Sequence, residues 1–214
     1  MDIRIKEAIR YLGYGKHAVD EKTLRSIEAS FEELIRVAEM KSVFQIYDLC
    51  FKDEKLIIIE NIEISSRNLQ TNLKDCRQVV LFAATLGTEV DRLLRKMQVV
   101  DMARAVVMQA CAATLLEEFC DKVQNEVAEQ LQQQGKYIRP RFSPGYGDFS
   151  ISHQKDFISL LDTPKKIGLS MTETYMLTPT KSVTAVIGIS DIATNGSLNT
   201  CGNCNKIDCK YKRG

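Results

Sequence analysis

The stretch QVVLFAATL, residues 78–86, decides the expected fold, because its apolar residues follow one another without the alternation of a half-exposed strand. A strand of this kind is buried on both faces and therefore lies in the middle of its sheet. The preceding segments 43–51 and 56–64 are rich in β-branched residues, and the short charged connector 52–55 between them favours a hairpin. Together these strands predict an antiparallel sheet.

Helical patterns surround these strands along the chain. Residues 100–134 contain no Gly or Pro and are dense in Ala, Met, Leu, Glu and Gln, which predicts one long or slightly broken helix closed by Gly135. Further helices are expected before Gly13 and over residues 20–38, 66–73, 88–98 and 154–161, and a last strand is expected over 183–189. We therefore expect an α+β fold in which a twisted, mainly antiparallel sheet packs against long helices.

The composition favours one compact domain. The chain has 214 residues, of which 44% are hydrophobic, and we expect a single domain over residues 1–194 followed by a polar tail over 195–214. The formal net charge is +1, so no overall field favours nucleic acid or an anionic membrane as a partner. The first residues lack an apolar signal core, and no stretch approaches the roughly 18 apolar residues of a membrane span. A cytoplasmic location is expected.

The seven cysteines fall into two groups. Four lie in segments with the pattern of core strands and helices, where reduced thiols act as small hydrophobes; they are Cys50, Cys76, Cys111 and Cys120. The other three, Cys201, Cys204 and Cys209, form a C-x2-C-x4-C cluster in the tail. Such spacing suits three corners of an iron–sulfur cluster, or a zinc site with a fourth ligand from elsewhere. The alternative is a flexible reduced tail whose cysteines are incidental.

Catalytic motifs are missing from the sequence. It has two histidines: His17 is expected at the surface of a loop, and His153 is expected to be a structural residue beside a helix. We find no nucleophile-elbow sequence, no phosphate-binding glycine loop and no two-histidine metal motif. No residue is therefore assigned a catalytic role, and a self-contained hydrolase or kinase is not expected.

The run RFSPGY, residues 141–146, has the composition of a ligand-binding turn. Gly145 lets the backbone approach a bound molecule, and Pro144 stiffens the chain before it. Tyr146 offers a flat face and a hydroxyl, and Arg141 can hold a carboxylate by a two-pronged charged hydrogen bond. The alternative is an ordinary surface loop.

Three blocks of sequence resemble the activation domain of cobalamin-dependent methionine synthase, and in particular its free-standing short relatives. The turn 141–146 is similar to the family's Arg-Pro-Ala-Pro-Gly-Tyr turn. Residues 172–175, with Pro179 and 182–184 after them, are similar to its Thr-Glu-Ser-Phe, Pro and Ser-Val-Ser block. The helical segment 115–119 is similar to one that carries an acid two positions before a Phe.

This resemblance implies that the turn binds S-adenosylmethionine. Arg141 would take the carboxylate of the methionine moiety, and the backbone around Gly145 and Tyr146, with Ser143, would contact the rest. Glu117 is the matching acid, for which the alternative is a solvated helix carboxylate. The family has a second acid six residues before the arginine, where this chain has Gly135.

The resemblance also implies a function in repair. Such domains present S-adenosylmethionine to oxidised cobalamin, and methyl transfer with a one-electron reduction restores methylcobalamin; the protein supplies positioning. No part of the sequence resembles a cobalamin, homocysteine or folate module. We therefore expect action in trans on a methionine synthase or related corrinoid protein that carries the cobalamin, as a component of its methyltransferase activity.

The electron for this reduction would come from a donor such as a flavodoxin or ferredoxin, or through a cluster at the tail cysteines. The alternative function is a non-catalytic scaffold, or a metal- or redox-binding interaction protein, for a corrinoid protein. A scaffold of this kind would not need S-adenosylmethionine.

Overall fold

The computed structural model describes residues 2–14, 19–53 and 56–193. Its main feature is a sheet with the strand order β3-β2-β1-β4-β8-β5, in which all the pairings are antiparallel. The strands are β1 (Lys41–Phe51), β2 (Leu56–Ile59), β3 (Ile62–Ser65), β4 (Gln78–Thr85), β5 (Tyr137–Ile138) and β8 (Ser182–Ser190). A separate hairpin joins β6 (Ser170–Met171) to β7 (Leu177–Thr178). The mixed helical and antiparallel fold is thus confirmed.

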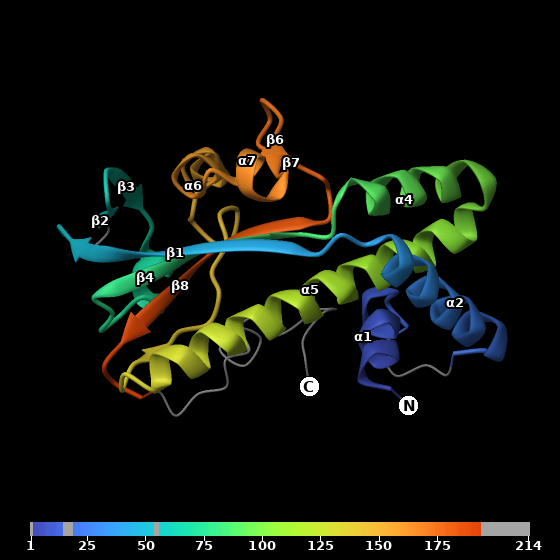
Figure 1. Ribbon diagram of the computed structural model, residues 1–214, viewed down its shortest axis with the longest axis horizontal. Coiled ribbons are helices and arrows are strands. Elements are labelled where there is room, and N and C mark those ends of the chain that lie inside the picture. The colour runs from blue at the N-terminus through green and yellow to red at the C-terminus, as the bar shows by residue number, and fades with distance from the viewer. Residues whose placement is uncertain (1, 15–18, 54–55, 194–214) are drawn as a thin grey trace.

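Strand β4 lies between β1 and β8 and is buried on both faces, as its sequence predicts. Val80, Phe82 and Ala84 enter one hydrophobic core, and their neighbours Val79, Leu81 and Ala83 enter another. The first core is covered by α1 (Ile3–Tyr11), α2 (Glu21–Val37), α4 (Thr88–Val100) and α5 (Met102–Gln132). The second core contains residues of α3 (Arg67–Asn72), α6 (Gln154–Leu161) and α7 (Thr163–Ile167). Figure 1 shows α5 along one face of the sheet and α6 and α7 on the other.

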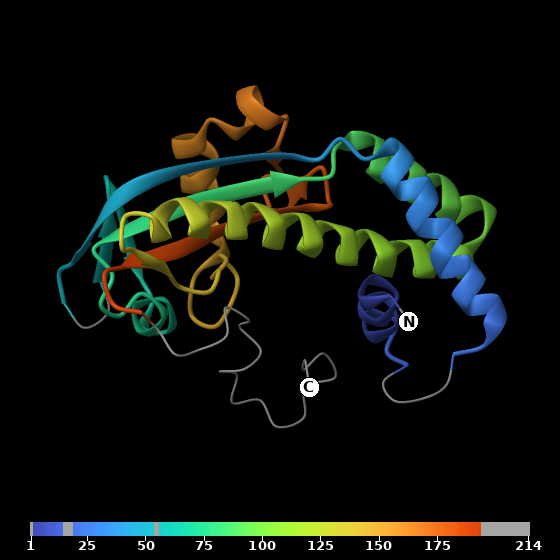
Figure 2. The same ribbon diagram turned by 60° about the horizontal axis from the view of Figure 1, so that its bottom comes forward.

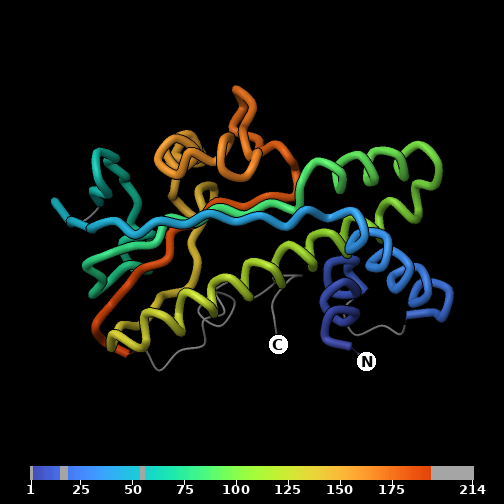
Figure 3. Tube along the Cα trace, in the orientation of Figure 1, coloured from blue at the N-terminus to red at the C-terminus, as the bar shows by residue number. Residues whose placement is uncertain are grey.

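The long helix expected over 100–134 is the single helix α5, which has 31 residues. Asp101 separates it from α4, and its side chain accepts a hydrogen bond of 3.0 Å from the Arg104 amide, as an N-cap does. The chain reverses at this point, so that α4 and α5 form the corner at one end of the molecule (Figure 3). At the other end Gly135, with φ of 71°, terminates α5.

The prediction of one strand over residues 56–64 was wrong in one respect, because this segment forms the two strands β2 and β3. Ile59 pairs with Ile62 across the two-residue turn of Glu60 and Asn61, and Glu60 has φ of 53°. Ile57 and Ile64, two residues beyond this pair on each strand, are fully buried, so β-branched core residues lie on both sides of the exposed turn. The apolar pattern therefore hid the turn.

Cys76, Cys111 and Cys120 are buried, as expected, whereas the prediction that Cys50 is a core residue was wrong. Cys50 lies near the end of β1, on a strand whose side chains there are mostly exposed. Burial raises the pKa of both Cys111 and Cys120 to about 12, so these thiols stay neutral. His17 and the tail cysteines lie outside the described residues. Among the described residues, no helix has the length and apolar character needed to cross a membrane.

We predict that Gly188→Ala destabilises the protein by about 1–3 kcal/mol through overpacking. A Cβ at this position of β8 would lie 2.6 Å from Cys76 Sγ, 2.9 Å from Leu73 Cδ2 and 3.0 Å from Arg139 Cγ. Urea unfolding measures the loss. The double variant Cys76→Ala/Gly188→Ala should recover part of it, because the nearest atom is gone, and Cys76→Ala alone completes the cycle. A Gly188→Ala protein with the wild-type free energy of unfolding would contradict this packing.

Candidate functional site

The segment that follows α5 crosses from one face of the sheet to the other. Ile138 of the edge strand β5 is buried in the first core, on the α5 side. Phe142 and Phe149, a few residues later, pack in the second core, on the side of α6. Figure 2 shows this segment running past the edge of the sheet between α5 and α6. The turn 141–146 therefore lies at the sheet edge, beside α5.

Backbone hydrogen bonds close the turn. Phe142 exchanges two of them with Val186 of β8, at 2.9 and 2.8 Å. Gly145, with φ of 95°, donates to the Phe149 carbonyl at 2.8 Å. Tyr146 donates to the Ser143 carbonyl at 3.2 Å, and its side chain is 67% exposed. The turn is thus fixed at its base and presents Tyr146 to solvent, as a ligand-binding turn requires.

Asp148 ties the turn to the start of α3. Its carboxylate accepts hydrogen bonds from Ser66 Oγ at 2.5 Å and from the amides of Arg67 at 2.8 Å and Asn68 at 3.1 Å. These bonds, of which the one from Ser66 contributes most, lower the pKa of Asp148 below its ordinary value. At Gly147, with φ of 56°, a Cβ would lie 3.0 Å from the Asn68 side chain. The far end of the turn is therefore held as firmly as its base.

Arg141 is held by the side chains of one face of α5. Its Nη2 donates to Asp121 Oδ1 at 2.7 Å and to Glu117 Oε2 at 3.1 Å, and its Nη1 donates to Gln124 Oε1 at 2.9 Å. The Arg141 side chain is 16% exposed, whereas those of Glu117 and Asp121 are 40% and 44% exposed. Two of the predicted ligand residues, Arg141 and Glu117, are thus brought together.

Asp121 and Gln124 were missed by the sequence analysis. They follow Glu117 at spacings of four and seven residues, which places all three on one face of a helix. That spacing is the signal that could have found them. With Glu117 as the one matched acid, the helical period alone points to its two neighbours.

The charge of Arg141 is well supported despite its burial. Burial by itself lowers the pKa of this guanidinium, but the neighbouring carboxylates of Asp121 and Glu117 raise it, and the net direction is upward. Arg141 therefore remains a cation, and three of its five N–H donors are used by α5. The others have no partner within the part of the chain that the structure describes.

Other sequence features lie away from Arg141. The block 172–175 forms the tip of the β6–β7 hairpin, where Thr172 donates its amide to the Met176 carbonyl at 2.8 Å. Figures 1 and 2 show this hairpin on the side of the sheet opposite to α5. His153 precedes α6, and its Nδ1 lies 2.8 Å from Asp156 Oδ2. This position beside a helix is the structural one expected for His153.

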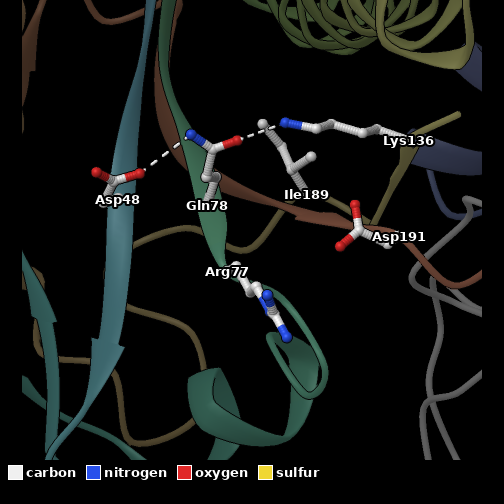
Figure 4. A pocket seen from close by; sticks show the side chains of 6 residues that line it. All are labelled: Asp48, Arg77, Gln78, Lys136, Ile189 and Asp191. Carbon is white, nitrogen blue, oxygen red and sulfur yellow. Dashed lines mark hydrogen bonds between the residues drawn. The ribbon is translucent and has the colours of Figure 1, made fainter. Parts of the chain in front are cut away.

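A hollow of about 300 Å³ lies where β4 begins and β8 ends, around Gln78 and Ile189 (Figure 4). There Gln78 joins two charged groups, donating to Asp48 at 3.1 Å and accepting from Lys136 at 2.8 Å. Arg77 and Asp191 complete a balanced set of two acids and two bases. This hollow is not lined by any of the predicted ligand residues.

The predicted metal ligands Cys201, Cys204 and Cys209 lie outside the described residues. Within residues 2–14, 19–53 and 56–193, no group of three His, Cys, Asp or Glu side chains is arranged to hold a metal ion.

Comparison with known proteins gives one family and one fold. Residues 63–208 match the family described as vitamin B12 dependent methionine synthase, activation domain. Among solved structures, the chain is similar to the crystal structure of the MetH reactivation domain bound to AdoHcy. That similarity has a TM-score of 0.60 and 15% sequence identity over 91% of this chain and 78% of that one. The search of curated proteins found no match.

We predict that Asp148→Ala destabilises the protein by about 1 kcal/mol, the usual effect of losing a helix cap, whereas Asp148→Asn retains most of the stability. Because the pKa of Asp148 is lowered on folding, its charge stabilises the protein above the ordinary value of 3.8, and this contribution is lost as the pH falls through the folded pKa. Urea unfolding at pH 7 and pH 3 measures both effects. An Asp148→Asn variant with the same pH dependence as wild type would exclude the carboxylate as its source.

Proposed function

The chain belongs to the family of vitamin B12 dependent methionine synthase activation domains, and from this membership we propose that it binds S-adenosylmethionine for the reductive reactivation of cobalamin. The single observation that carries the proposal is the meeting of Arg141 and Glu117, at 3.1 Å, beside the turn of Gly145 and Tyr146. These residues come from two distant parts of the chain. They offer a cation, an acid and a backbone turn at one place.

The residues fit the polar end of S-adenosylmethionine. Arg141 would bind the ligand's carboxylate through the N–H donors that α5 leaves unused. Glu117 would accept from the ligand's ammonium group, and its half-exposed carboxylate is open to it. Gly145 has no side chain, and its positive φ is a conformation that favours glycine, so the ligand can approach the backbone between Ser143 and Tyr146.

The chemistry would belong to the ligand and to the partner. Bound S-adenosylmethionine supplies a methyl group on a sulfonium, and the cobalamin would be carried by a separate methionine synthase or related corrinoid protein. The role of this chain is then to hold the ligand in position. The exposed side chain of Tyr146 would face the partner at that point. A flavodoxin or ferredoxin would deliver the electron.

A scaffold that does not bind the ligand is the second candidate. It is favoured by the contacts of Arg141, whose charge is already balanced by Glu117 and Asp121. It is also favoured by Gly135, which stands where the resemblance places a second acid. Ligand binding distinguishes the two functions.

The tail, residues 195–214, is proposed as an appendage to the domain of residues 1–194 that binds a metal through Cys201, Cys204 and Cys209. An iron–sulfur cluster there would give the chain its own route for the electron. Zinc would give the tail a structural role instead.

We predict that the wild-type protein binds S-adenosylmethionine in a calorimetric titration and that Arg141→Ala weakens binding at least about 10-fold, as expected for the loss of a charged hydrogen bond. Arg104→Ala is the matched control, because Arg104 is a partly buried arginine of α5 that also pairs with an acid of another element, Glu33 of α2 at 2.6 Å, and it lies apart from the turn. Its affinity should be unchanged.

The same variants test the reaction. Wild type added in trans should restore the activity of a methionine synthase that lacks its activation domain, and Arg141→Ala should not. Wild-type reactivation by Arg141→Ala would contradict the proposed site. Partner binding without ligand binding would favour the scaffold.

We predict that protein purified without oxygen contains iron or zinc and that replacing the three tail cysteines by serine removes it. Elemental analysis measures the metal, and visible absorption distinguishes an iron–sulfur cluster from zinc. The control is Cys50→Ser, which changes an exposed cysteine of the domain. A tail without metal in the wild type would mean that its cysteines are incidental.

A further inference from the structure

Asp121 is the charged residue beside Arg141 to which the proposed site assigns no group of the ligand. It lies 2.7 Å from Arg141 Nη2, closer than Glu117 at 3.1 Å. One guanidinium and two carboxylates leave one net negative charge at this place. In the proposed site Arg141 balances the ligand's carboxylate and Glu117 balances its ammonium group. The charge of Asp121 then has no counterpart at the amino-acid end of the ligand.

Gln124 shows that the position of Arg141 does not by itself require two acids. Its side chain is 4% exposed and accepts from Nη1 at 2.9 Å without adding a charge. A neutral acceptor in place of Asp121 could hold Nη2 in the same way. The carboxylate at position 121 therefore changes the electrostatics of the site more than its shape.

The sulfur atom of the ligand is the remaining charged centre. S-adenosylmethionine has a sulfonium, whereas its demethylated product has a neutral thioether. Three carbon atoms separate this sulfur from the carboxylate carbon. Asp121 contacts the same guanidinium at 2.7 Å, so a ligand whose carboxylate binds Arg141 brings its sulfur into the neighbourhood of the Asp121 carboxylate. Charges closer than the Debye length of about 8 Å are not fully screened.

We propose that Asp121 makes the site select the cationic sulfonium over the neutral thioether product, so that the product leaves after methyl transfer. This inference rests on the proposed function. It adds a residue that interacts with the sulfonium charge of the ligand rather than with its carboxylate or ammonium group. At a half-exposed site the interaction of two unit charges corresponds to a factor of about five to ten in relative affinity.

The test is calorimetric titration with S-adenosylmethionine and with S-adenosylhomocysteine as the two probes. Asp121→Asn should reduce the ratio of the two affinities about five- to ten-fold, chiefly by weakening the sulfonium ligand. Asp121→Glu should keep the wild-type ratio, because it keeps the charge. The matched control is Glu126→Gln, which removes the charge of an exposed acid on the same helix that has no contact at Arg141. Its ratio should equal that of wild type.

The outcomes separate this inference from the proposed function. If Asp121→Asn weakens both probes equally, the ratio of affinities is unchanged, Asp121 only positions Arg141 and the inference is overturned. If Asp121→Asn binds each probe as tightly as wild type does, the inference is overturned while the ligand site stands. If wild type binds neither probe, the proposed function fails and the inference falls with it.

Discussion

The burial of β4 on both faces is the constraint on which the rest of the structure depends. A strand whose consecutive residues enter opposite cores needs a layer of structure on each side, and α5 and α6 supply one each. These are successive α-helices of the chain on opposite faces of the sheet, so the segment between them must pass from one face to the other. It does so at the open edge next to β8, where the short strand β5 pairs. The position of the turn 141–146 is a consequence of this crossing.

The crossing also explains why the turn meets α5. Arg141 stands between Ile138 in one core and Phe142 against the other, so its side chain can reach back to the helix that the chain has just left. The two adjacent acids of α5 then have separate roles. Glu117 pairs with Arg141, whereas Glu118 pairs with Arg4 of α1 at 2.6 Å. Of these two acids, Glu117 is thus the one in contact with the arginine of the turn.

The fold was more predictable from the sequence than the site, for physical reasons. A strand or helix extends over many residues, so β4 could be found from its continuous apolar run and α5 from a long stretch of helix-favouring residues without Gly or Pro. The turn of Glu60 and Asn61 was missed because isoleucines lie close on both sides of it, and the whole segment therefore has the composition of one strand. The contacts of Arg141 depend on where the chain crosses the sheet, and no local pattern encodes that. The resemblance supplied Glu117 and Arg141. The helical period places Asp121 and Gln124 on the same face as Glu117, but their contacts with Arg141 are seen only in the structure.

The acid missing at position 135 has a structural reason. This residue ends α5 with φ of 71°, a conformation that glycine adopts freely and that costs other residues about 1 kcal/mol or more. With so short a connection between α5 and β5, the helix must end there, and the position is therefore poorly suited to an acidic side chain. A second acid can instead lie on the helix itself, one turn after Glu117. Asp121 occupies that position and is in contact with the arginine.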